Sequence, residues 1–101
     1  MPNSIAPQNL TKQASEVRTY SMDFSNLMAS AETIASITSV TSELRGGGTS
    51  DLTLASETIS GQTITVIISN GTKAHTYRVE IIIVTSSGAV LEGDGLLKIS
   101  N

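Results

Sequence analysis

Few residues of this chain could carry chemistry, and they are scattered. His75 is the only histidine and there is no cysteine, so neither a second imidazole nor a thiolate is available to complete a zinc shell. A serine–histidine–aspartate triad could be assembled on paper from His75 and Asp23, Asp51 or Asp94, but no G-x-S-x-G nucleophile elbow supports it. His75 is therefore interpreted as a surface residue beside a turn.

Two glycine-containing segments resemble ligand loops only in part. EGDG at 92–95 brings Glu92 and Asp94 to one face but lacks the other oxygen ligands of a calcium loop. GGGTS at 46–50 lacks the lysine of a phosphate-binding loop. No two carboxylates lie in a stretch apolar enough to raise the pKa of one of them for acid–base catalysis. We therefore predict that the protein is not an enzyme and uses neither a metal nor a cofactor.

Composition limits the partners. The chain has 101 residues, the length of one domain. Its formal net charge is −3, with six basic residues and no basic run, so it could not neutralise a row of phosphates, and nucleic acid is excluded. The longest aliphatic run, 81–84, is far shorter than the ~20 residues of a membrane helix. Residues 1–10 lack the basic and apolar regions of a secretory signal. We expect a soluble protein made in the cytosol, with no membrane partner.

The N-terminal segment differs from the rest. Residues 1–16 contain both prolines and show no period of 2 or 3.6, with Ile5 and Leu10 as isolated apolar residues. We interpret them as an extended arm, which either frays or docks onto a partner. Residues 17–101 are assigned to one globular domain.

Alternation of apolar and polar residues predicts six or seven short strands in the domain. The expected strands span 17–24, 33–40, 51–55, 62–69, 75–85 and 89–100, with an ambiguous alternation in 33–40 and a bulge at Gly93 and Gly95. A helical turn is expected at 25–32, and 45–50 and 69–72 are expected to be turns. The pattern is typical of an all-β, antiparallel Ig-like sandwich, in which Tyr77 would either form the tyrosine corner or be an ordinary buried tyrosine.

The outer face of this sandwich is the candidate contact surface. If Tyr77, Val79, Ile81 and Ile83 face the core, Ile82 and Val84 face outward, and Leu96 joins them from the last strand. Two alternatives are that the bulge reverses the face of Leu96, or that the arm covers the patch within the same chain. The candidate partner-binding residues are Ile5, Leu10, Ile82, Val84 and Leu96.

The order and spacing of several motifs resemble the fibre–tail adaptors of tailed bacteriophages. The motifs are YSMDFSNL at 20–27, ETIASITSV at 32–40, LTLASETISGQTITVIISNGT at 52–72, YRVEIIIVTSSGAV at 77–90 and GLLKIS at 95–100. The chain has Phe24 and Ser39 where that family usually has tryptophans, and RGGGTS at 45–50 resembles a local insertion. The resemblance implies a small Ig-like virion protein with no active site.

We therefore predict a non-enzymatic virion protein, made in the host bacterial cytoplasm. It would join tail or neck to fibres through its arm and outer sheet face, and would be oligomeric in the particle. The alternative is a capsid cement or decoration protein that clamps shell subunits. A carbohydrate-binding module is disfavoured, because the three aromatic residues are all expected to face inward.

Overall fold

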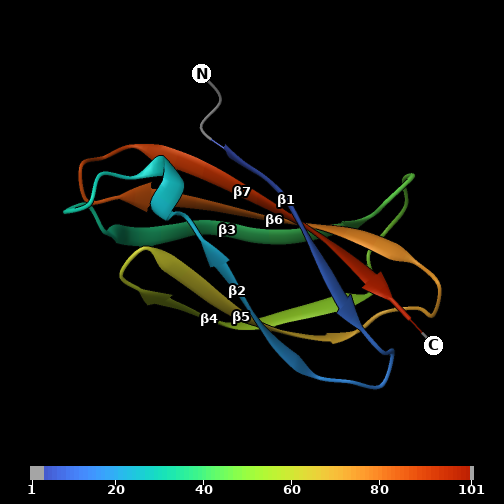
Figure 1. The fold of residues 1–101 in the computed structure, drawn as a ribbon. Coiled ribbons are helices and arrows are strands. Elements are labelled where there is room, and N and C mark those ends of the chain that lie inside the picture. The colour runs from blue at the N-terminus through green and yellow to red at the C-terminus, as the bar shows by residue number, and fades with distance from the viewer. Residues whose placement is uncertain (1–3, 101) are drawn as a thin grey trace.

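The computed structural model describes the backbone of residues 4–100 and the side chains of residues 10–100, which form two packed β-sheets (Figure 1). In chain order the strands are β1 (Ser4–Lys12), β2 (Arg18–Asp23), β3 (Ile34–Leu44), β4 (Leu52–Ser60), β5 (Thr63–Asn70), β6 (Thr76–Thr85) and β7 (Val90–Ile99). One sheet has the order β1-β7-β6-β3 and the other β2-β5-β4. Within this range no helix has the length and apolarity needed to cross a membrane.

The strand order is that of an Ig-like sandwich. β2, β5 and β4 take the places of strands B, E and D, and β3, β6 and β7 those of C, F and G. The predicted all-β sandwich is confirmed, with seven strands. The wholly antiparallel arrangement is wrong at one place, because β1 pairs with β7 in parallel. β1 and β2 lie in different sheets, and the chain crosses between the sheets after β1. β1 runs in the same direction as β7 (Figure 1).

The segment predicted as an arm is extended, but it lies along the edge of a sheet. Residues 4–12 pair with β7, with a register shift between Ile5 and Gln8. The shift spans Pro7, which has no N–H to give to the ladder. Lys12, at the end of β1, is buried, and its ammonium donates to the backbone oxygens of Gln13 (2.7 Å) and Ala14 (3.1 Å).

The core lies between the two sheets, and its alternation follows the sequence pattern. The inward residues of β5 and β6 are almost fully buried: Ile64, Val66, Ile68, Tyr77, Val79, Ile81 and Ile83. From β2 and the residue after it, Met22 and Phe24 join them, as expected for the aromatic inner face of this strand. Burial of these side chains is the main stabilising contribution, at roughly 1.5–3 kcal/mol for each large aliphatic residue.

The bulge expected at Gly93 and Gly95 occurs on one side of β7 only. β6 and β7 pair without a shift from Thr76–Lys98 to Val84–Val90, whereas the pairing of β7 with β1 is shifted at Gly93 and Gly95, with the extra residue in β1. Gly93 also makes room for side chains of the facing sheet. β3 has two shifts against β6, which explains its ambiguous alternation.

Three elements differ in length from the prediction. β4 continues to Ser60 instead of ending at residue 55, with a shift between Ala55 and Thr58 that breaks its alternation. β3 likewise extends beyond residue 40, to Leu44. The helical turn expected over 25–32 is only the 3-10 turn η1 (Ser25–Leu27).

Tyr77 forms the predicted tyrosine corner at the start of β6. Its hydroxyl accepts a hydrogen bond from the backbone N–H of Thr72 (2.8 Å) and donates one to the carboxylate of Asp51. The turn between β5 and β6 has positive φ at Asn70 (67°) and Gly71 (105°), as the Asn-Gly pair predicts. The Tyr77 hydroxyl, followed by that of Thr72, holds the pKa of Asp51 below its ordinary value. The hydroxyl of Tyr77 therefore links the start of β6 to the turn after β5 and to the residue before β4.

Candidate protein-docking face

The two outward faces of the sandwich differ in chemistry. The outward positions of β2, β5 and β4 are mainly hydroxylated: Thr19, Ser21, Thr53, Thr58, Ser60, Thr63, Thr65 and Ser69. On the other sheet, the outward positions of β6 and β7 carry mainly charged and aliphatic residues, beside Ser36, Ser39, Thr41 and Glu43 of β3. Because charge pattern and apolar area give an interface its specificity, the second surface is the candidate functional site, here called the outer face.

Strand register orders the outer face into five rungs, each with one residue from β7 and one from β6, and four of them also with one from β3. From one end to the other the rungs are Lys98–Thr76, Leu96–Arg78–Glu43, Asp94–Glu80–Thr41, Glu92–Ile82–Ser39 and Val90–Val84–Ser36. Successive rungs are about 6.8 Å apart, twice the rise of one residue in a strand. The face thus passes from a basic end through a charged middle to an apolar end.

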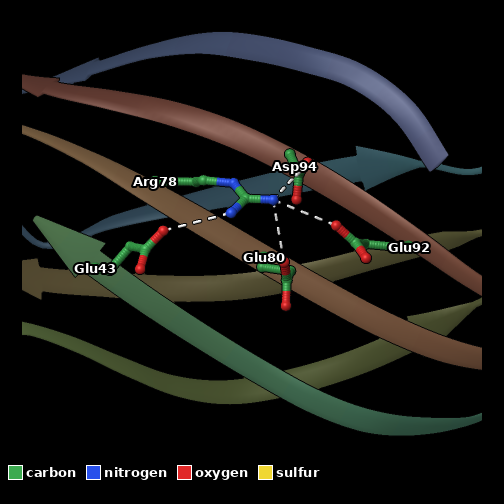
Figure 2. Close-up of polar contacts among 5 residues, drawn as sticks. All are labelled: Glu43, Arg78, Glu80, Glu92 and Asp94. Carbon is green, nitrogen blue, oxygen red and sulfur yellow. Dashed lines mark hydrogen bonds and ion pairs between the residues drawn. The ribbon is translucent and has the colours of Figure 1, made fainter. Parts of the chain in front are cut away.

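Arg78 is the centre of the charged middle (Figure 2). Its guanidinium is 3.1 Å from a carboxylate oxygen of Glu80 and of Asp94, 3.3 Å from Glu43 and 3.4 Å from Glu92. The hydrogen bond and charge of Asp94 are the main causes that raise the pKa of Arg78. Four carboxylates face one cation, so the cluster has a formal charge of −3.

The carboxylates of this cluster are not equally satisfied. The second oxygen of Asp94, Oδ1, is buried and has no hydrogen-bond partner. Burial, followed by the neighbouring Glu80 and Asp94, raises the pKa of Glu92. Oxygens of Glu80, Glu92 and Asp94 lie within 4.8 Å of one another, a spacing that could suit a metal ion. Arg78 already neutralises part of their charge, so the arrangement is described as an ion-pair network.

Structure and prediction agree on the side of the sheet that Ile82, Val84 and Leu96 occupy. Ile82 and Val84 lie next to each other on β6, half-buried on the outer face. Leu96 is on the same face, but the Asp94–Glu80 rung separates it from them. The third member of the apolar end is Val90, which is 55% exposed and pairs with Val84.

The two candidate residues from the N-terminal segment lie on β1, at the edge of the sheet beside β7. Leu10 pairs with Leu97 and packs against the core. The backbone of Ile5 pairs with Gly93, and its side chain lies outside the described residues.

Sequence reasoning missed Val90 and the Arg78 cluster. Val90 stands directly after the hairpin loop, and its alternation with Leu91 was a usable signal that it points outward. Arg78 and Glu80 are two residues apart in a predicted strand, and EGDG was considered for a metal. Their convergence depends on the β6–β7 register, which places Glu80 opposite Asp94.

Two hollows flank the rung of Arg78 and Leu96. One, of about 220 Å³, is lined by Leu10, Arg45, Thr76, Leu96 and Lys98 and is here called the basic hollow. The other, of about 200 Å³, is lined by Thr41, Ser42, Glu43, Arg78 and Glu80 and is here called the acidic hollow. Hollows of this kind accept protruding side chains of a bound protein.

The fold and the outer face define a small Ig-like β-sandwich with a charged and partly apolar sheet surface. The chain belongs to the family described as podophage GP4 fiber-tail adaptor protein gp77, whose model matches residues 12–98. The resemblance drawn from the sequence motifs is therefore confirmed. Among curated proteins, none matches the chain.

Family membership gives the role in outline. The family suggests a structural role as a phage tail-fibre adaptor, which implies a location in the virion and contacts with other tail or fibre proteins. A structural adaptor family also implies a non-enzymatic role.

Proposed function

We propose that this protein joins tail or neck to fibres in the virion, and that the apolar end of the outer face and the N-terminal segment make the contacts. Ile82, Val84 and Val90 would provide the buried centre of one contact, with Glu92 at its rim. Ile5 and Leu10 would belong to the second, through residues 1–16. The observation that carries the proposal is the exposed Val90 beside half-buried Val84, because a hydrophobic group rimmed by polar residues is typical of protein contact sites.

Quantitative analysis of purified virions tests this function. If the protein is an adaptor, it should be present at about a dozen copies per particle or fewer, in line with the small number of tail and fibre positions. Hundreds of copies would instead identify the alternative, a capsid cement protein. Absence from the particle would overturn both.

The proposed contact at the apolar end is tested by complementation. Virions would be assembled from a phage lacking this gene, with the wild-type protein, the Val90→Asp variant or the Thr58→Asp variant supplied in trans. Val90→Asp is expected to reduce incorporation at least tenfold, because it buries a charge in the contact. Thr58→Asp, an exposed change on the opposite sheet, is expected to incorporate normally. Equal incorporation of the two variants would contradict the proposed surface.

A further inference from the structure

Opposite charges flank the rung of Arg78 and Leu96 on the outer face. On one side lies the basic hollow, with Arg45 and Lys98. On the other lie Glu80, at the acidic hollow, and Asp94 beside it, whereas Glu43 belongs to the central rung itself. The Lys98 rung and the Asp94 rung are the two neighbours of the Leu96 rung, and each lies about 6.8 Å from it.

We propose that two copies of this protein associate through this charged half of the outer face. The twofold axis would lie between the outer faces of the two copies, parallel to both. It would run perpendicular to the strands, along the Leu96 rung. Such an axis exchanges the rungs on either side of it and makes the contact isologous. Lys98 of each copy then faces Asp94 of the second copy, and Leu96 faces its own counterpart.

In this arrangement each hollow is covered by residues of the second copy. The backbone N–H of Arg45 bonds to the oxygen of Thr76, which places Arg45 at the end of β3, four residues from Thr41. The twofold axis brings Arg45 of one copy over Thr41 of the second copy, at the acidic hollow. The Asp94 carboxylate correspondingly approaches the basic hollow beside Lys98. The two Arg78 side chains also come near each other, but each is compensated by four carboxylates of its own chain.

The size of the contact predicts weak association. An axis at the Leu96 rung overlaps the three rungs from Lys98 to Asp94 across four strands, which is about 400 Å² per copy, or about 800 Å² in total. Contacts of this size are typical of transient complexes, so we expect a dissociation constant on the order of 0.1 mM. The Val84–Val90 rung lies beyond the overlap and stays free for the contact proposed above. The dimer therefore leaves the proposed contact at Val90 free, and the two proposals can fail separately; Leu10, which lines the basic hollow, is the residue that both use.

Sedimentation velocity of the purified protein tests the dimer from about 10 µM to about 1 mM. The sedimentation coefficient should rise with concentration, and association should weaken about tenfold or more between about 50 mM and 500 mM NaCl, because the opposing charges are exposed. A monomer at every concentration in low salt would overturn the proposal.

Charge-swap variants test the orientation. Arg45→Glu brings a carboxylate over Thr41 of the second copy, close to Glu80, and Thr41→Lys brings an ammonium over Arg45 of the second copy; each variant alone should be monomeric. An equimolar mixture should recover a dimer, because the two altered faces are then complementary. The matched control is Arg18→Glu, with the same charge change as Arg45→Glu at an exposed site away from the outer face, which should associate as the wild type does. A mixture that stays monomeric, or a control that loses association equally, would contradict the proposed axis.

Discussion

Gly93 lies directly beneath the ring of Phe24. A Cβ atom at Gly93 would stand 2.8 Å from Cζ of that ring, and it would also collide with the sulfur of Met22. Phe24 is fully buried between the sheets and cannot move away freely. The absence of a side chain at Gly93 thus sets how closely β7 approaches the strand that carries the aromatic core.

Gly93→Ala is accordingly expected to destabilise the protein by about 1–3 kcal/mol, the usual cost of forcing an extra methyl group into a packed core. Chemical denaturation of the variant measures this cost. Met22→Ala should reduce it, because the Met22 sulfur is the atom nearest to the added methyl group, so the double variant should be more stable than the sum of the two single changes predicts. Strict additivity would show that the contact does not limit the packing.

Tyr77→Phe is expected to lower the free energy of unfolding by about 1–3 kcal/mol. The change leaves the ring buried but removes the hydroxyl that accepts from Thr72 and donates to Asp51. The backbone N–H of Thr72 and one carboxylate oxygen of Asp51 then lose this partner. Thermal melts compare the variant with Tyr20→Phe, which removes one exposed hydrogen bond to the oxygen of Thr11 and should cost less. An equal cost for both would argue against the corner as a stabilising feature.

Much of the fold could be predicted because alternation acts locally. Strands β5 and β6 follow a strict period of two, and their inward residues are those the pattern selects. The Asn70–Gly71 turn was also predictable, because only a few residue types accept its backbone conformation. Such features depend on residues that are close in sequence.

The remaining features depend on pairing between distant segments. β1 has no periodicity, and its strand conformation comes from hydrogen bonds with β7 at the other end of the chain. Gly93 was predicted to form a bulge because glycine is unusual inside a strand. Its packing contact with Phe24 was not predicted, because Phe24 is 69 positions earlier in the sequence. The alternation correctly predicted that Ile82, Val84 and Leu96 lie on the outer face. The charged residues around Arg78 separate Leu96 from the other two because of the β6–β7 register, which the sequence does not specify.

Ile81 and Ile82 are neighbours in β6 with opposite expected responses to aspartate. Ile81 is 1% exposed, so Ile81→Asp would bury an unpaired charge and should unfold the domain, at a cost above about 4 kcal/mol. Ile82 is half-buried on the outer face, so Ile82→Asp should leave the domain folded while lowering its incorporation into virions. Circular-dichroism melts measure the first effect and quantitative gels of particles the second. If Ile82→Asp unfolds the domain and Ile81→Asp does not, the assignment of faces is wrong.

Deletion of residues 1–16 is expected to destabilise the domain as well as to weaken its assembly. The deletion removes the partner strand of β7 and the buried Lys12, and it exposes part of Leu97 and Ile99. We expect the midpoint of thermal unfolding to fall by several degrees, as a loss of about 1–2 kcal/mol would produce in a domain of this size. An unchanged midpoint would show that β1 contributes no net stability and that residues 1–16 serve only as an arm.

Glu92→Gln is expected to stabilise the protein near pH 7. The pKa of Glu92 is raised in the folded state, by burial and then by Glu80 and Asp94, so the folded protein binds its proton more tightly than the unfolded chain does. Stability of the wild type should therefore rise as the pH falls from 7 through the folded pKa towards the unfolded value of about 4.3. The glutamine variant should lack this rise. Asp94→Asn is the control, because Asp94 is only 13% exposed and is the main partner of Arg78; it should destabilise. Melting midpoints measured between about pH 4.5 and 7.5 would contradict this account if Glu92→Gln lowered stability at pH 7.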